Sequence, residues 1–343
     1  MTVDAVEALY ARGVTDGLPV VPPTRPRVAQ AVAAAGRPAD ELIAEVPPGY
    51  GRATVERIAV NAVMAGCRPE YLPVVIAGVE AMCDDAFDLH GLSGTTDAVA
   101  PLFVINGPIR KRLDVNSGVG AFGPGWRANA TIGRALRLIW ANIGGARPGT
   151  ISMSTFGQPG RYAYCIGEYE EANPWEPLHV EHGFAAADST VAAFAGEPLL
   201  VISAPRSRTA EDILITVARG MESIGHCKAM GLGDTLVVLA PEHARAVAGD
   251  GWSKARVRRF LWEQLRKPVK DLIPGKDGGE GLAESVLATF ADPETDETLI
   301  PKFRAPDNLK ILVAGGTAGR FTAVIPGWSF PNAPSSLVIK KIR

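Results

Sequence analysis

Residues 100–145, APLFVINGPIRKRLDVNSGVGAFGPGWRANATIGRALRLIWANIGG, predict one complete α/β unit, and the rest of the fold follows from it. The apolar run at 101–105 is typical of a buried strand, which the turn Asn106-Gly107-Pro108 ends. After a glycine-rich loop, a helix is predicted from about Asn129 to the glycine pair at 144–145. Its apolar face comprises Ile132, Ala135, Leu136, Ile139 and Ile143.

The start of this predicted helix has the features of a small anion site. The first backbone N–H groups of a helix have no partner within the helix, and the helix dipole favours negative charge there. Arg127 adds a guanidinium that fits a carboxylate or phosphate. The glycine spacing matches neither the dinucleotide fingerprint nor the phosphate loop, so a nucleotide is not implied. The predicted substrate-binding residues are Thr95, Thr96, Asn106, Asn116, Ser117, Trp126, Arg127 and Asn129.

Composition narrows the class of protein. The 343 residues are 47% hydrophobic and carry a net charge of −2, enough for a sizeable core and without a basic block. We therefore expect no nucleic-acid partner and no membrane partner. The N-terminal residues do not read as a signal peptide, and the four cysteines lack pairing spacing. Both observations predict reduced thiols and a cytoplasmic protein.

A repeated pattern predicts two related α/β halves with mixed or parallel sheets and a cleft between them. In each half a proline-closed strand is followed by a Thr-x-Glu motif that begins a helix, at Thr54 and at Thr209. Ligands of open α/β sheets bind beyond the carboxyl ends of strands, so the cleft is the expected site. The predicted boundaries are 1–147 for the first half, 148–188 for a connecting segment and 189–343 for the second half.

Three residues are candidates for catalysis. His90 lies in a polar loop before the central strand, beside two threonines, where a histidine can act as an acid or base. Cys165 and Glu168 lie at the end of a further predicted strand, over 162–166. A cysteine at a strand end acts as a nucleophile when a neighbouring cation lowers its pKa, whereas the alternative is an inert core thiol.

A metal site is a second possibility. His179 and His182 are three residues apart, a spacing at which two imidazoles can share one ion, and Cys165 or Glu168 would complete the set of ligands. Pro174 and Pro177 oppose a regular helix there, and the spacing matches no zinc signature. The cofactor therefore stays open between none and one divalent transition metal.

Several motifs together resemble a known family. They are TDGLPVVPPT at 15–24, TVERIAVNAVMAGC at 54–67, GWRANATIGRALRLI at 125–139, NPWEPLHVEHGF at 173–184 and ILVAGGTAGRFTAVIPGW at 311–328. The chain resembles a bacterial family associated with small (seleno)proteins that carry a Sec/Cys-Gly-Ser-Cys (UGSC) motif. The resemblance implies thiol or selenol chemistry with a partner protein. This sequence has no Cys-Gly-Ser-Cys, so that motif would come from elsewhere.

Three functions follow from these patterns. The first is an enzyme that acts on a small carboxylate-bearing substrate by thiol-linked lyase or redox chemistry. The second is a metal-dependent lyase or hydrolase that uses His179 and His182. The third is a non-catalytic partner subunit of a small thiol or selenol redox protein. Assembly into a homo-oligomer is compatible with each of them.

Overall fold

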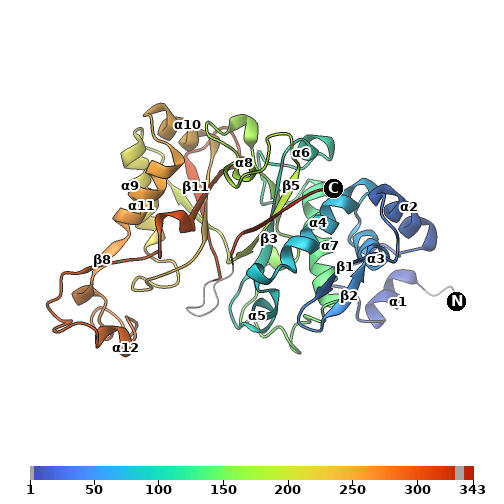
Figure 1. Ribbon diagram of the computed structural model, residues 1–343, viewed down its shortest axis with the longest axis horizontal. Helices are drawn as coiled ribbons and strands as arrows, with labels where there is room; N and C mark the ends of the chain where they lie inside the picture. Colours follow the sequence, from blue (N-terminus) through green and yellow to red (C-terminus); the bar gives the residue numbers. More distant parts are fainter. Residues whose placement is uncertain (1–3, 329–335) are drawn as a thin grey trace. The chain divides into compact units, whose positions relative to one another are not determined.

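The computed structural model describes residues 4–328 and 336–343, which form two compact units (Figure 1). Unit 1 holds the described residues of 4–170, 176–198 and 336–343, and unit 2 holds those of 171–175 and 199–328. The predicted boundaries at 147 and 188 therefore differ from the observed division. Most of the predicted connecting segment is part of unit 1, and so is the C-terminal strand.

Unit 1 is built around a four-stranded mixed sheet in the order β12-β5-β3-β4. Strand β3 (Ala100–Asn106) is parallel to β4 (Cys165–Gly167) and antiparallel to β5 (Thr190–Gly196), which is antiparallel to β12 (Val338–Lys341). Because every residue of β5 and all but Pro101 of β3 are buried, these two strands form the centre of the core. The mixed sheet confirms the predicted α/β class.

Helices α3 (Val55–Ala65), α4 (Leu72–Met82) and α7 (Arg127–Asn142) pack on one another, and α4 and α7 contact the sheet. Thr54 caps α3 by accepting a hydrogen bond from the Arg57 N–H, as its sequence motif predicts. The other elements of unit 1 are α1 (Ala5–Ala11), α2 (Arg25–Ala35), β1 (Leu42–Val46), β2 (Gly51–Thr54), η1 (Pro69–Tyr71), η2 (Asp85–Phe87), α5 (Leu89–Gly94), α6 (Ile109–Arg112), η3 (Pro159–Arg161), η4 (Glu170–Ala172), which continues into unit 2, and α8 (Leu178–Glu181).

Unit 2 also contains a four-stranded mixed sheet, in the order β10-β7-β11-β6. Strand β7 (Thr235–Leu239) is parallel to β10 (Leu309–Val313) and antiparallel to β11 (Phe321–Pro326), which is antiparallel to β6 (Leu200–Ser203). Thr209 caps α9 (Ala210–Met221), as predicted. The other elements are α10 (Pro241–Gly249), α11 (Lys254–Gln264), β8 (Arg266–Pro268), η5 (Val269–Asp271), α12 (Glu284–Leu287), β9 (Leu299–Pro301) and η6 (Pro306–Asn308). Among the described residues, no helix has both the length and the apolar character needed to cross a bilayer.

The apolar run at 18–21, closed by Pro22-Pro23, predicts a short strand that the structure does not contain. The run pairs with no strand, and a side chain of α7 bonds to its carbonyls instead. Arg134 donates to the Leu18 and Pro19 carbonyls at 3.2 and 2.9 Å. The prediction of a strand was therefore wrong.

The turn after β3 depends on glycine. Gly107 has φ +85°, and a Cβ there would lie 2.0 Å from the Asp188 carbonyl oxygen. We expect Gly107→Ala to lower the free energy of unfolding by about 2–5 kcal/mol, because it adds a backbone clash to the cost of a left-handed residue. Urea denaturation measures this change.

Gly120 provides the matched control, since its φ is +67° and a Cβ there meets open space. Gly120→Ala is expected to cost only about 1–2 kcal/mol. Equal losses in the two variants would show that the contact with Asp188 does not constrain the turn.

Candidate functional site

A buried polar cluster lies where β3 and β4 end. Asn106 is the last residue of β3 and Glu168 directly follows β4, and both side chains are almost fully buried. The Asn106 Nδ2 group donates to Glu168 Oε2 at 2.7 Å and to Glu170 Oε1 at 3.1 Å. The same Glu170 oxygen accepts from the Gly107 N–H at 2.7 Å and from Arg110 Nε at 3.0 Å. The structure thus joins two residues that the sequence predicted and adds Glu170 and Arg110.

His179, the first of the two predicted metal ligands, belongs to this cluster. Its helix, α8, is tied to Glu168, which accepts the Leu178 N–H at 2.7 Å. The ring is 1% exposed, and neither ring nitrogen makes a hydrogen bond of good geometry, although a weaker contact with the Ala186 backbone favours its charged form. Burial lowers the pKa of His179, so the ring is neutral at pH 7. Asn106 Oδ1 and Thr190 Oγ1, which lie on paired residues of β3 and β5, are also unpartnered.

No metal site is evident in the described part of the chain. Within it, no group of three or more His, Cys, Asp or Glu side chains is placed to hold an ion. His182 Nδ1 lies 2.8 Å from the Leu178 carbonyl oxygen of its own helical turn. That ring nitrogen therefore caps α8, which leaves the predicted pairing of His179 and His182 without support.

Asn116, Ser117 and Asn129, which were predicted to bind substrate, are structural. The Asn116 N–H donates to Asn129 Oδ1 at 2.8 Å, and Asn129 Nδ2 donates to the Asn116 carbonyl at 2.9 Å. This reciprocal pair holds the glycine-rich loop to α7. Ser117 is buried against Gly167 of β4. The side-chain amide groups of Asn116 and Asn129 are thus used within the chain.

Cys165 is a core thiol, which corrects its predicted role as a nucleophile. It is 6% exposed at the start of β4, where Gly133 of α7 lies against it. Burial raises the pKa of Cys165, and the neighbouring Cys67 raises it further. Since the thiolate is the nucleophile, this group is protonated and unreactive at neutral pH.

His90, Thr95 and Thr96 lie away from the polar cluster, which corrects their predicted place in one site with Asn106. They precede β3, whose seven residues separate its two ends by about 20 Å. His90 is exposed and stacks on Tyr50, whose hydroxyl is 3.1 Å from His90 Nδ1. Thr95 Oγ1 accepts the Asp97 N–H in a local turn. Loops that enter and leave one strand lie at opposite ends of the sheet.

Arg127 begins α7, as predicted, but it faces α3 and not the glycine-rich loop. Its Nε and Nη2 groups both donate to the Gly66 carbonyl, at 3.0 and 2.9 Å. Trp126 is the N-cap residue and makes no side-chain capping bond. Arg127 lines a cavity of about 210 Å³, which we call the Arg127 cavity.

A larger cavity, of about 650 Å³, lies at the other end of α7. We call it the Arg137 cavity, and all of its lining residues belong to unit 1. They are Gly13, Thr15, Asp16, Arg137, Ala141, Asn142, Arg147, Pro148, Phe156, Gly157, Gln158, Pro159, Arg161 and Tyr162. None of these residues was among the predicted site residues. The sequence feature that could have indicated this cavity is the concentration of arginines between residues 134 and 161.

The Arg137 cavity is positively charged. Arg137 donates to the Ala146 carbonyl at 3.2 Å and lies over the Trp140 ring. Burial, together with the smaller effect of the Arg161 charge, lowers the pKa of Arg137 to about 10. Arg161 donates to the Val99 carbonyl at 3.0 Å and to Ser152 Oγ at 2.7 Å, and burial lowers its pKa as well. Two like charges thus face one space without a counterion of their own.

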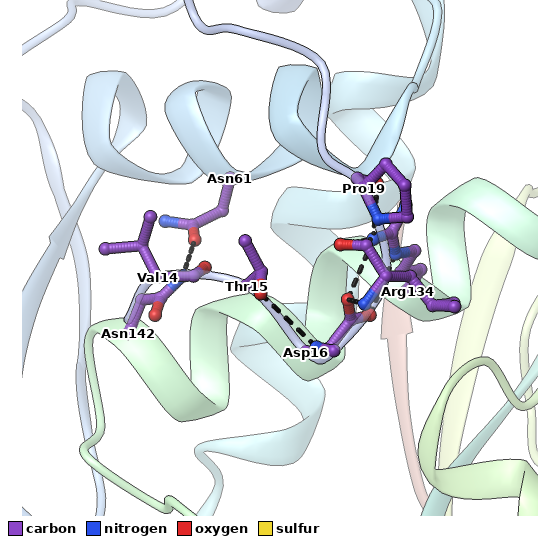
Figure 2. A network of polar contacts seen from close by, with 9 residues as sticks. Val14, Thr15, Asp16, Pro19, Asn61, Arg134 and Asn142 are labelled. Carbon is purple, nitrogen blue, oxygen red and sulfur yellow. Dashed lines mark hydrogen bonds and ion pairs between the residues drawn. The ribbon is translucent and has the colours of Figure 1, made fainter. Parts of the chain in front are cut away.

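The single acid among the lining residues, Asp16, is already paired. Figure 2 shows the network that holds it. Arg134 reaches both Asp16 oxygens through two hydrogen bonds of 2.8 Å. Asn142 Nδ2 donates to the Val14 carbonyl and to Asn61 Oδ1, both at 2.9 Å. These contacts fix the segment 14–19 as one wall of the cavity.

Aromatic side chains form a further part of the lining. Phe156 is 93% exposed and Tyr162 is 49% exposed, although both are largely apolar. An exposed phenylalanine on a cavity of this size is typical of a ligand site, because ligand pockets combine apolar walls with a few polar groups.

No protein-family model, curated protein or solved structure significantly matches this chain. The two candidate sites, the buried polar cluster and the Arg137 cavity, are therefore interpreted from their geometry.

The ion pair between Asp16 and Arg134 makes stability depend on pH. Burial alone would raise the pKa of Asp16, but the hydrogen bond and charge of Arg134 outweigh it, and the pKa is lowered from 3.8. Because the pKa of Asp16 is lower in the folded protein than in the unfolded chain, the ion pair stabilises the fold at a pH above the unfolded pKa. This stabilisation is lost as the pH falls through the folded pKa. We expect Asp16→Asn to cost about 1.5–3 kcal/mol at pH 7. Urea denaturation at pH 7, 5 and 3 measures the difference from wild type.

This difference should be full at pH 5 and 7 and should shrink below pH 3.8, where the wild-type carboxylate becomes protonated. A difference that stayed constant down to pH 3 would contradict the ion pair.

His179→Leu is expected to raise the free energy of unfolding by about 1 kcal/mol at pH 7.5, because it removes two unpaired buried nitrogens. The stability gained by His179→Leu should be larger at pH 5. The pKa of His179 is lowered in the folded protein, so the wild-type protein loses stability as the pH falls through the folded pKa. His243→Leu is the matched control. That residue is equally buried, and its Nε2 is also unpartnered, but its Nδ1 bonds to Thr322 Oγ1 at 2.9 Å, so stability should fall. A loss of stability in His179→Leu would mean that its ring is paired.

Proposed function

We propose that the protein is an enzyme that acts on a small organic acid and binds this acid in the Arg137 cavity. The observation that carries the proposal is the charge of that cavity. Arg137, Arg147 and Arg161 line it, and its one carboxylate, on Asp16, is held by Arg134. A carboxylate of the substrate would supply the missing negative charge.

The energetics favour such a ligand. Two neighbouring guanidinium groups repel each other, and partial burial strengthens this repulsion because it reduces screening by water. A carboxylate between Arg137 and Arg161 replaces repulsion by two charge-assisted hydrogen-bonded contacts. Each guanidinium keeps donors for this purpose, because it has five N–H groups and its hydrogen bonds within the protein use only some of them.

The rest of the lining suggests the body of the acid. Phe156, Tyr162 and Pro159 offer apolar surface, and Gln158 and Thr15 are polar. Gln158 is held in place, because its Nε2 group donates to the Ala98 and Gly196 carbonyls at 2.6 and 2.9 Å. We therefore propose an acid with an apolar or aromatic body. The proposed site lies within unit 1, whereas the sequence placed it between two halves.

Thiol chemistry, if the family resemblance holds, requires a sulfur atom from outside the core. Burial raises the pKa of Cys67 and Cys83 to about 12, and that of Cys165 is raised as well. Cys227 is the one exposed cysteine of the four. This favours a second candidate function, in which the chain works with a small thiol or selenol protein that carries the redox motif.

We also propose that the two units arose by duplication of one unit. The support is the shared pattern of the two sheets, in which β4, β3, β5 and β12 correspond to β10, β7, β11 and β6 in both order and direction. The copies differ in one connection. The edge strand β6 precedes β7 along the chain, whereas β12 follows all other strands.

Calorimetric titration with a panel of small aliphatic and aromatic carboxylic acids tests the first proposal. We expect one-to-one binding of at least one acid. Arg137→Gln should weaken it by about 1.5–3 kcal/mol, the cost of a lost charge-assisted hydrogen bond. The same variant should not lower the melting temperature, because it relieves the repulsion with Arg161.

Arg12→Gln is the control, because it removes the same charge as Arg137→Gln. Arg12 is exposed at the end of α1 and does not line the cavity. It should leave binding unchanged. The proposal fails if no acid of the panel saturates the protein, or if both variants weaken binding equally.

A further inference from the structure

The Arg127 cavity, at the opposite end of α7 from the proposed substrate site, is a second positively charged space. Three arginines from separate parts of unit 1 line it. Arg27 comes from α2, Arg68 from the residue before η1, and Arg127 from the start of α7. The other lining residues are Val21, Gln30, Ala31, Ala62, Val63, Gly66, Cys67, Pro69 and Leu72.

The three guanidinium groups keep most of their donors. Arg27 gives one bond, from Nη1 to the Pro22 carbonyl at 3.1 Å. Arg127 directs Nε and Nη2 to a single carbonyl, that of Gly66. The Arg68 carbonyl accepts the Tyr71 N–H at 3.1 Å, but the Arg68 side chain makes no hydrogen bond or ion pair with the described residues. Since each guanidinium has five N–H groups, most of the donors around this cavity are available to a ligand.

No acidic side chain lines the cavity to neutralise these charges. Cys67 is the only lining group besides the arginines that titrates, and burial raises its pKa to about 12. Its Sγ donates to the Thr131 carbonyl at 3.2 Å, so the thiol is protonated and neutral at pH 7. The remaining lining is apolar apart from Gln30 and backbone.

We propose that the Arg127 cavity binds a phosphate group. Three guanidinium groups from different elements suit a tetrahedral oxyanion better than a planar carboxylate, because the oxyanion offers several acceptor edges. The start of α7 adds a smaller contribution, because this helix of 16 residues has no side-chain cap and its dipole favours an anion. The inference is independent of the function proposed for the Arg137 cavity.

Titration of the whole chain with inorganic phosphate, at constant ionic strength and followed by calorimetry, tests the inference. We expect saturable one-to-one binding that Arg68→Gln weakens at least about tenfold, the usual effect of one lost charge-assisted contact. Arg68 is the best position to change, because it holds no other group of the fold. A parallel titration with glycerol 3-phosphate tests whether the site is suited to free phosphate or to a phosphomonoester. A site for phosphomonoesters should bind glycerol 3-phosphate more tightly than inorganic phosphate.

Two variants serve as controls. Arg25→Gln removes an exposed arginine of the same helix, α2, that does not line the cavity, and it should leave phosphate binding unchanged. Arg137→Gln should also leave it unchanged, which separates this site from the proposed acid site. The inference is overturned if phosphate does not saturate the chain, if Arg25→Gln weakens binding as much as Arg68→Gln, or if Arg137→Gln alone abolishes it.

Discussion

The close approach of α7 to the start of β4 is the constraint on which unit 1 depends. A Cβ at Gly133 would lie 2.8 Å from the Tyr164 nitrogen and 3.2 Å from the Cys165 Cβ, so no larger residue fits without movement of backbone. The same contact buries Cys165 and removes it from chemistry. It also places the two ends of one rigid helix at two arginine-lined cavities.

Both candidate sites in unit 1 contain features that a stable core would avoid. In one, Arg137 and Arg161 share a partly buried space. Burial lowers the pKa of both, and the charge of Arg161 also lowers that of Arg137. In the other, His179 is buried with two unpaired nitrogens. Such arrangements cost stability, and proteins keep them where a ligand or a reaction uses them. The equivalent strand ends of unit 2 carry Ala240 and Ala314, which have no such polar groups.

Local patterns predicted local structure well. The strand at 101–105, the helix that begins near Asn129 and the caps at Thr54 and Thr209 depend on apolar period and on side chains that bond to adjacent N–H groups. The polar residues at the end of β3 and directly after β4 were also identifiable, because parallel strands end at one edge of a sheet. The strand expected at 18–21 was wrong because a strand needs a neighbour, and neighbours are set by distant residues.

The sequence by itself determined the α/β class, the ends of the main elements and the excess of arginine around α7, since each is a property of short segments. Only the tertiary structure decided which charges meet. Asp16 is paired with a residue 118 positions away, and that pairing leaves the Arg137 cavity without a free acid. It also decided that Cys165 is buried and that His90 lies at the far end of β3. The physical reason is that burial and electrostatics depend on distances in space, which separation along the chain does not specify.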